Sequence, residues 1–139
     1  MSAFETSTDK LNYLKGLIRI AKCNGEIDPE EQNYYLMAAN NMQLSTAELQ
    51  EINALWSEIG EISISFSTKY DELFFLQEAI QLCCIDGRYD DAEKKELIAI
   101  AKEWGVGQHY LDEIHAWVIE GLDWKKRGEA MLTKMAERR

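Results

Sequence analysis

A loop followed by a capped helix occurs twice in this sequence, and this repetition favours a duplicated helical fold. Gly25 and Gly87 each end an apolar run with helical spacing, and each is followed three residues later by an aspartate, Asp28 or Asp90. Glycine tolerates the left-handed conformation that ends a helix. Aspartate is a favoured N-cap, the residue just before the first helical turn. The two copies lie 62 residues apart, which predicts an internal duplication.

The register of the two halves extends beyond the loops. Placing Gly25 on Gly87 also places Glu31 on Glu93, a match that apolar helical spacing alone does not require. The apolar positions that coincide are Leu14 with Leu76, Ile18 with Ile80, Ala39 with Ala101, Leu49 with Leu111 and Ile52 with Ile114. We therefore predict a single all-α domain of about seven helices. Two three-helix repeats cover about residues 9–60 and 69–121, and a C-terminal helix covers about 122–138.

The stretch from Glu61 to Ser67 alternates apolar and polar residues, which is the period of a β-strand. It is the only such stretch in the sequence, and a lone strand has no partner for its backbone hydrogen bonds. We predict an extended linker between the repeats, with isoleucine and phenylalanine side chains that pack on the helices.

The formal net charge of −10 argues against a general nucleic-acid-binding protein, because such proteins bind largely by neutralising phosphates. The charge is uneven: residues 125–139 hold six basic and two acidic side chains, a net +4 that leaves −14 on the rest. The sequence shows no signal peptide, and no apolar run approaches the roughly 20 residues of a membrane span. Three cysteines without framework spacing suit a reducing compartment. These features predict a cytoplasmic protein.

The segments Ala21–Glu31 and Cys83–Glu93 resemble the Asp-Gly-x-hydrophobic-Asp/Ser-x-x-Glu signature of TerB-like domains. Those domains occur in tellurite-resistance and stress-response proteins, with relatives in DjlA-type co-chaperones. The resemblance covers roughly residues 10–120 and includes the duplicated, all-helical layout. It implies a non-enzymatic module of bacterial responses to chemical or phage stress, with metal binding and membrane association through partners as expected properties. The first repeat departs from the signature at Asn24, where aspartate is typical, which weakens the case for a cation at that loop.

The acids beside the two loops are the candidate metal ligands: Asp28, Glu31, Asp86, Asp90 and Glu93. Hard cations such as Ca²⁺ and Mg²⁺ bind several oxygen ligands close together. Helix capping accounts for four of these acids and is the favoured explanation for them. Asp86 is different, because it stands at a helix end, where a negative charge is mildly unfavourable. It is the leading single candidate for a functional residue.

A pseudo-two-fold axis between the repeats would bring the two loops face to face. Opposed carboxylates would then share a cation or shift a pKa upward. Cys23, Cys83 and Cys84 are interpreted as small buried apolar residues. The sequence contains no nucleophile-and-base arrangement and no phosphate-binding loop, so we do not expect an enzyme.

The basic C-terminal segment carries Trp124, Met131, Leu132 and Met135 on one face of a helix. The favoured interpretation is a terminal helix that closes the core and turns its basic face to the acidic body. The alternative is a helix for a partner or for an anionic membrane surface, as a peripheral association.

We expect a stress-response interaction module with a protein partner and no nucleic acid, as a monomer or a homodimer. The alternative function is a regulatory or structural protein without a metal site, which acts by self-association or by contact with a partner or membrane surface.

Overall fold

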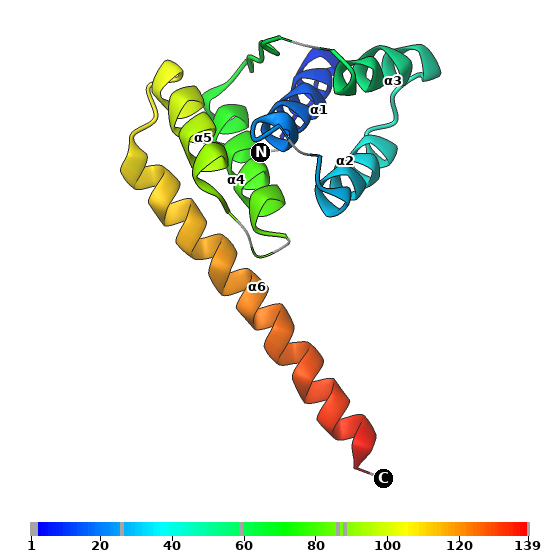
Figure 1. The fold of residues 1–139 in the computed structure, drawn as a ribbon, viewed down its shortest axis with the longest axis vertical. Coiled ribbons are helices and arrows are strands. Elements are labelled where there is room, and N and C mark those ends of the chain that lie inside the picture. Colours follow the sequence, from blue (N-terminus) through cyan, green and yellow to red (C-terminus); the bar gives the residue numbers. More distant parts are fainter. Residues whose placement is uncertain (1–2, 26, 59, 86, 88, 139) are drawn as a thin grey trace.

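The computed structural model describes residues 3–25, 27–58, 60–85, 87 and 89–138, and this part of the chain is all-α (Figure 1). The predicted fold class is confirmed. The helices are α1 (Ser7–Lys22), α2 (Pro29–Asn41), α3 (Thr46–Asn53) with a 3-10 turn η1 (Ala54–Trp56), α4 (Lys69–Cys84), α5 (Asp91–Glu103) and α6 (Gln108–Glu137).

The helix bounds repeat at the offset of 62 residues that the loops predict. α1 and α4 are both 16 residues long, α2 and α5 are both 13, and each pair begins and ends at equivalent positions. The N-caps repeat as well: Thr6 and Thr68 cap the first pair, and Asp28 and Asp90 cap the second. Local capping chemistry therefore fixes the same helix starts twice.

Glycine ends the first helix of each repeat, as predicted. Gly25 and Gly87 have φ angles of 81° and 80°, in the left-handed region. The backbone N–H of Gly25 donates to the carbonyl of Lys22, and that of Gly87 to Cys84, both at 3.0 Å. A side chain here would be strained by its own backbone, which explains why glycine stands at both positions.

A second left-handed position follows the second helix of each repeat, and here the two repeats differ. Gly105 has a φ of 70°, whereas its counterpart, Gln43, adopts a φ of 56° with a side chain. A left-handed conformation costs a non-glycine residue roughly 1–2 kcal/mol.

We expect Gln43→Gly to raise the free energy of unfolding by about 0.5–1 kcal/mol, because relief of this strain outweighs the added flexibility of the unfolded chain. Urea unfolding followed by circular dichroism measures the change. The reverse substitution, Gly105→Gln, should cost a similar amount. A Gln43→Gly variant less stable than the parent would contradict the argument.

The core forms where the two repeats meet. α1 packs on α4, and the contacts between α1 and α5 are matched by contacts between α2 and α4. This reciprocal pattern is that of a pseudo-two-fold arrangement. The linker before α4 contributes as predicted: Ile64 is buried, and the Phe66 ring lies 5.5 Å from that of Phe75 and 5.7 Å from that of Trp104.

α6 differs from the prediction in two ways. The expected boundary near residues 121 and 122 is absent, and one helix of 30 residues runs through it. A single glycine, Gly121, lowers helix stability by only about 1 kcal/mol, and no proline interrupts the run.

The expected closing of the core by the tail is also wrong. Leu111 and Val118 lie on one face of α6 and pack its first half against α4 and α5. The next residue on this face, seven positions further along, is Lys125, so the apolar face ends there. The second half therefore projects away from the body (Figure 1). In the described part of the chain, no helix combines the length and apolarity needed to cross a bilayer.

Candidate functional site

The buried charged residues of the described chain are four acids, and each occupies the same place in its helix. Asp9, Glu31, Asp71 and Glu93 are the third residues of α1, α2, α4 and α5, counted from the residue after the N-cap. The offset of 62 relates Asp9 to Asp71 and Glu31 to Glu93. The fold therefore buries two symmetric pairs of carboxyl groups, which is costly unless each pair is compensated.

The aspartate pair is compensated by donors from the chain. Asp9 accepts hydrogen bonds from the backbone N–H of Ser67 at 3.2 Å and from its hydroxyl at 2.7 Å. Asp71 accepts from the backbone N–H of Phe4 at 3.1 Å. Burial alone would raise the pKa of Asp9, but the hydrogen bonds from Ser67 and Thr6 outweigh it, and the pKa is lowered. Each aspartate therefore ties its own helix to the segment that precedes the other helix: Asp9 of α1 to Ser67, and Asp71 of α4 to Phe4.

The glutamate pair has different surroundings. Glu31 is 3% exposed and Glu93 is 2% exposed, and the thiol of the fully buried Cys83 lies beside them. One ligand atom from each of these three residues lies within 4.8 Å of the other two. We call these residues the Glu31–Cys83–Glu93 cluster. It joins α2 of the first repeat to α4 and α5 of the second.

The ionisation of this cluster is perturbed in the direction expected for buried acids. Burial raises the pKa of Glu93, and hydrogen bonds from its neighbours only partly oppose the rise. Burial and the nearby charge of Glu93 also raise the pKa of the Cys83 thiol. The raised pKa values of Glu93 and of the Cys83 thiol favour the protonated form of both groups. The cluster thus holds protons that a cation could replace.

Helix capping positions both glutamates. Asp90 and Glu93 form a capping box: Asp90 accepts from the backbone N–H of Glu93 at 2.8 Å, and Glu93 accepts from that of Asp90 at 3.1 Å. Asp28 caps α2 by accepting from the N–H of Glu30 at 2.7 Å. The caps fix where each helix starts, and so they fix where the third residue of each helix lies.

Asn24 links the two loops. Its side-chain amide donates to the carboxylate of Asp90 at 3.0 Å, across the repeat boundary. An aspartate at this position would place a second negative charge beside Asp90, which the asparagine amide avoids. Tyr34 adds a second tie between the repeats by donating to Glu78 at 2.6 Å.

The five predicted ligands therefore have three outcomes. Glu31 and Glu93 come together, Asp28 and Asp90 serve as caps outside the cluster, and Asp86 lies outside the described residues. Sequence reasoning missed Cys83, which it assigned to the core. The sequence did contain one signal for it: on the helix that precedes the loop, Cys83 of the second repeat stands where the first repeat has Ala21.

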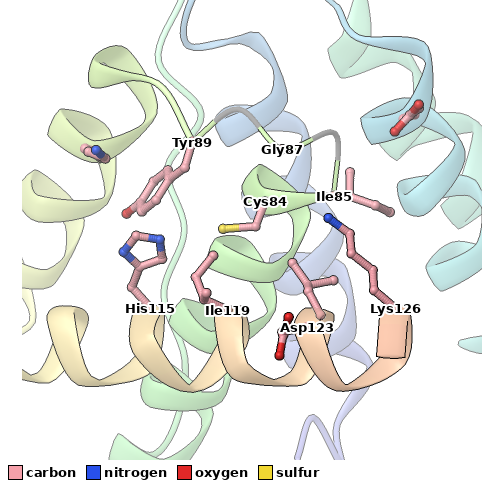
Figure 2. Close-up of a pocket in the computed structure, with 11 residues that line it drawn as sticks. Cys84, Ile85, Gly87, Tyr89, His115, Ile119, Asp123 and Lys126 are labelled. Carbon is pink, nitrogen blue, oxygen red and sulfur yellow. The ribbon is translucent and has the colours of Figure 1, made fainter. Parts of the chain in front are cut away.

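Next to this cluster in the chain, Cys84 lines an open hollow of about 640 Å³ between the end of α4 and α6. Figure 2 shows His115, Asp123 and Lys126 along α6 on one side of the hollow, and Tyr89 above His115. The rings of Tyr89 and His115 are 4.8 Å apart. Acidic, basic and apolar side chains are mixed here and do not converge on one ligand type. The buried cluster is therefore the stronger candidate site.

Comparison with known proteins identifies no relative: no family model, no curated protein and no solved structure matches the chain. The resemblance to TerB-like domains rests on the repeated motif alone.

Proposed function

We propose that this protein is a non-enzymatic interaction module of a stress response, of the TerB-like kind, that binds one divalent cation between its repeats. The Glu31–Cys83–Glu93 cluster carries the proposal, because it places two carboxylates and a thiol within 4.8 Å of one another in the protein interior. The repeated loop motif supports the stress-response context, and the cytoplasm is its proposed location.

The donor set supports Zn²⁺ more strongly than the Ca²⁺ or Mg²⁺ expected from the acidic loops. Ca²⁺ takes six to eight oxygen ligands, and Mg²⁺ requires near-octahedral oxygen coordination. Zn²⁺ accepts sulfur and carboxylate oxygen together, and three protein ligands leave one of its four positions open. A cation here would also compensate the buried negative charge.

Cation binding would bring the two repeats together. Glu31 belongs to the first repeat, whereas Cys83 and Glu93 belong to the second. Binding must displace protons from Cys83 and Glu93, and their raised pKa values mean that affinity increases with pH. Cation binding would act on a protein partner by changing the relative position of the two repeats. The net charge of −10 favours a partner with a basic surface.

Zn²⁺ should raise the melting temperature of the metal-free protein at pH 7.5, and Mg²⁺ and Ca²⁺ should do so less. A ligand at 100 times its Kd stabilises a fold by about 2.7 kcal/mol, which corresponds to several degrees for a domain of this size. Glu31→Gln and Glu93→Gln should each remove the shift, because amides are poor replacements for carboxylate ligands. Isothermal titration calorimetry gives the stoichiometry, which we expect to be one ion per chain.

Glu30→Gln is the matched control, because it removes the same charge one residue away, on the exposed face of α2. It should keep the shift. A response that survives in the Glu93→Gln variant, or the absence of any response to the three ions, would contradict cation binding at this cluster.

A further inference from the structure

α6 carries a second apolar row, distinct from the row that packs on the body. Its members recur with the alternating spacing of three and four residues that defines a coiled-coil seam. We call these eight residues the α6 seam: Tyr110, Ile114, Trp117, Gly121, Trp124, Gly128, Met131 and Met135. Ile114 is half-buried, and the other large members face solvent, with Trp117 56% exposed and Trp124 69% exposed. The body-facing residues Leu111 and Val118 lie about 100° around the helix from it.

No contact among the described residues requires the two glycines of the seam. Each lowers helix stability by about 1 kcal/mol relative to alanine, in the middle of a long helix. Apart from the adjoining turns of α6 itself, no described atom lies within 4 Å of the position that a Cβ atom would take at Gly121 or Gly128. The glycines alternate with Trp117 and Trp124, so the seam presents large side chains and gaps in turn.

We propose that two copies of this protein associate through their α6 seams as an antiparallel helical pair. In one register every bulky residue meets a small or flexible one. Trp117 faces Gly128 of the partner subunit, and Trp124 faces Gly121 of the partner subunit. Farther from the centre of the pair, Ile114 faces Met131 of the partner subunit, and Tyr110 faces Met135 of the partner subunit. Parallel pairing would instead stack tryptophan on tryptophan and glycine on glycine.

The charges that flank the seam favour the same register. At the positions that flank the seam, the first half of α6 holds Glu113 and Glu120, whereas the second half holds Lys125, Arg127 and Lys134. Antiparallel pairing brings Glu113 near Lys134 of the partner subunit and Glu120 near Arg127 of the partner subunit. Within its own helix, Arg127 lies 3.0 Å from Asp123, and both side chains are more than half exposed, so this contact is readily exchanged. This charge complementarity identifies a second copy as the occupant.

The body offers space for the partner helix. Two hollows of about 480 Å³ and 170 Å³ lie along the seam, with Trp117 in the lining of both. α4 forms their other wall, through Tyr70 and Phe74 in the first hollow and Gln81 in the second. The second half of α6 projects clear of its own body (Figure 1), so it can lie in this groove on another copy.

Sedimentation equilibrium at concentrations on the order of 100 μM should give twice the monomer mass of 16.0 kDa. Glu120→Arg and Arg127→Glu should each weaken association at least tenfold by placing like charges across the pair. An equimolar mixture of the two variants should restore it, because each chain then supplies the charge that the other lacks. The emission of Trp117 and Trp124 should shift to shorter wavelength on association.

Gly128→Leu tests the seam without threatening the fold. Leucine fills the gap that receives Trp117, so association should weaken at least tenfold while helix content stays equal or rises. A wild-type protein that remains monomeric would overturn the proposal, and binding of that monomer to vesicles with anionic headgroups would assign the seam to a membrane surface instead. Failure of the mixed charge variants to associate, when each alone has lost association, would overturn the antiparallel register.

Discussion

Replacing Gly16 by valine should lower the free energy of unfolding by about 3 kcal/mol or more, the upper range for an overpacked core. Gly16 lies where α1 meets α4, and a Cβ atom there would fall on the Phe75 ring, well inside van der Waals contact. That ring is fully buried and packs on Phe66 and Trp104, so it cannot move aside at low cost. We expect the melting temperature to fall by about 10 °C.

A double-mutant cycle identifies the cause. Gly16→Ala should destabilise the protein although alanine is the better helix former, and Phe75→Leu should destabilise it by loss of packing. Combined, the two changes should cost less than their separate effects added together, because the smaller side chain makes room for the new methyl group. Strict additivity in urea unfolding would show that the Phe75 ring is not the obstacle.

Glu93→Gln should stabilise the metal-free protein at neutral pH, with a gain that depends on pH. The folded state raises the pKa of Glu93 by burial, so it binds this proton more tightly than the unfolded chain does. The contribution of wild-type Glu93 is therefore fully present below the ordinary value of about 4.5, and it is lost as pH rises through the raised pKa. Glutamine does not titrate and preserves an oxygen for the capping box.

The difference in unfolding free energy between the variant and the parent should thus be small near pH 4.5 and grow toward neutral pH, to on the order of 1 kcal/mol. Urea unfolding in the presence of a chelator measures it at each pH. Glu103→Gln, at the exposed end of α5, should show no such trend. A gain that is constant with pH would exclude the buried charge as its source, whether or not the cluster binds a cation.

The sequence was sufficient for the first two helices of each repeat because the signals that start and end them are local. A glycine in the left-handed conformation, as at Gly25 and Gly87, and an N-cap such as Asp90 act on neighbours only a few residues away. The same helix-ending and helix-capping residues recur at an offset of 62 residues, and this recurrence predicted the duplication. The linker was predicted for a similar reason, since a lone alternating stretch has no strand to pair with.

The candidate site depended on contacts that no local pattern encodes. Asp9, Asp71, Glu31 and Glu93 occupy the same capping position in their helices, so they are equivalent in sequence. Packing made them different: Asp9 received donors from Ser67, 58 residues away, whereas Glu93 met Glu31 and Cys83.

The same holds for α6. Its apolar spacing predicted a buried face, but only the tertiary structure showed that the body ends before the second half of the helix does. The sequence alone therefore determined where the first two helices of each repeat begin and end, but not that α6 continues through Gly121. The tertiary structure decided which side chains lose contact with water, because burial depends on what lies across from a residue and not on its neighbours along the chain.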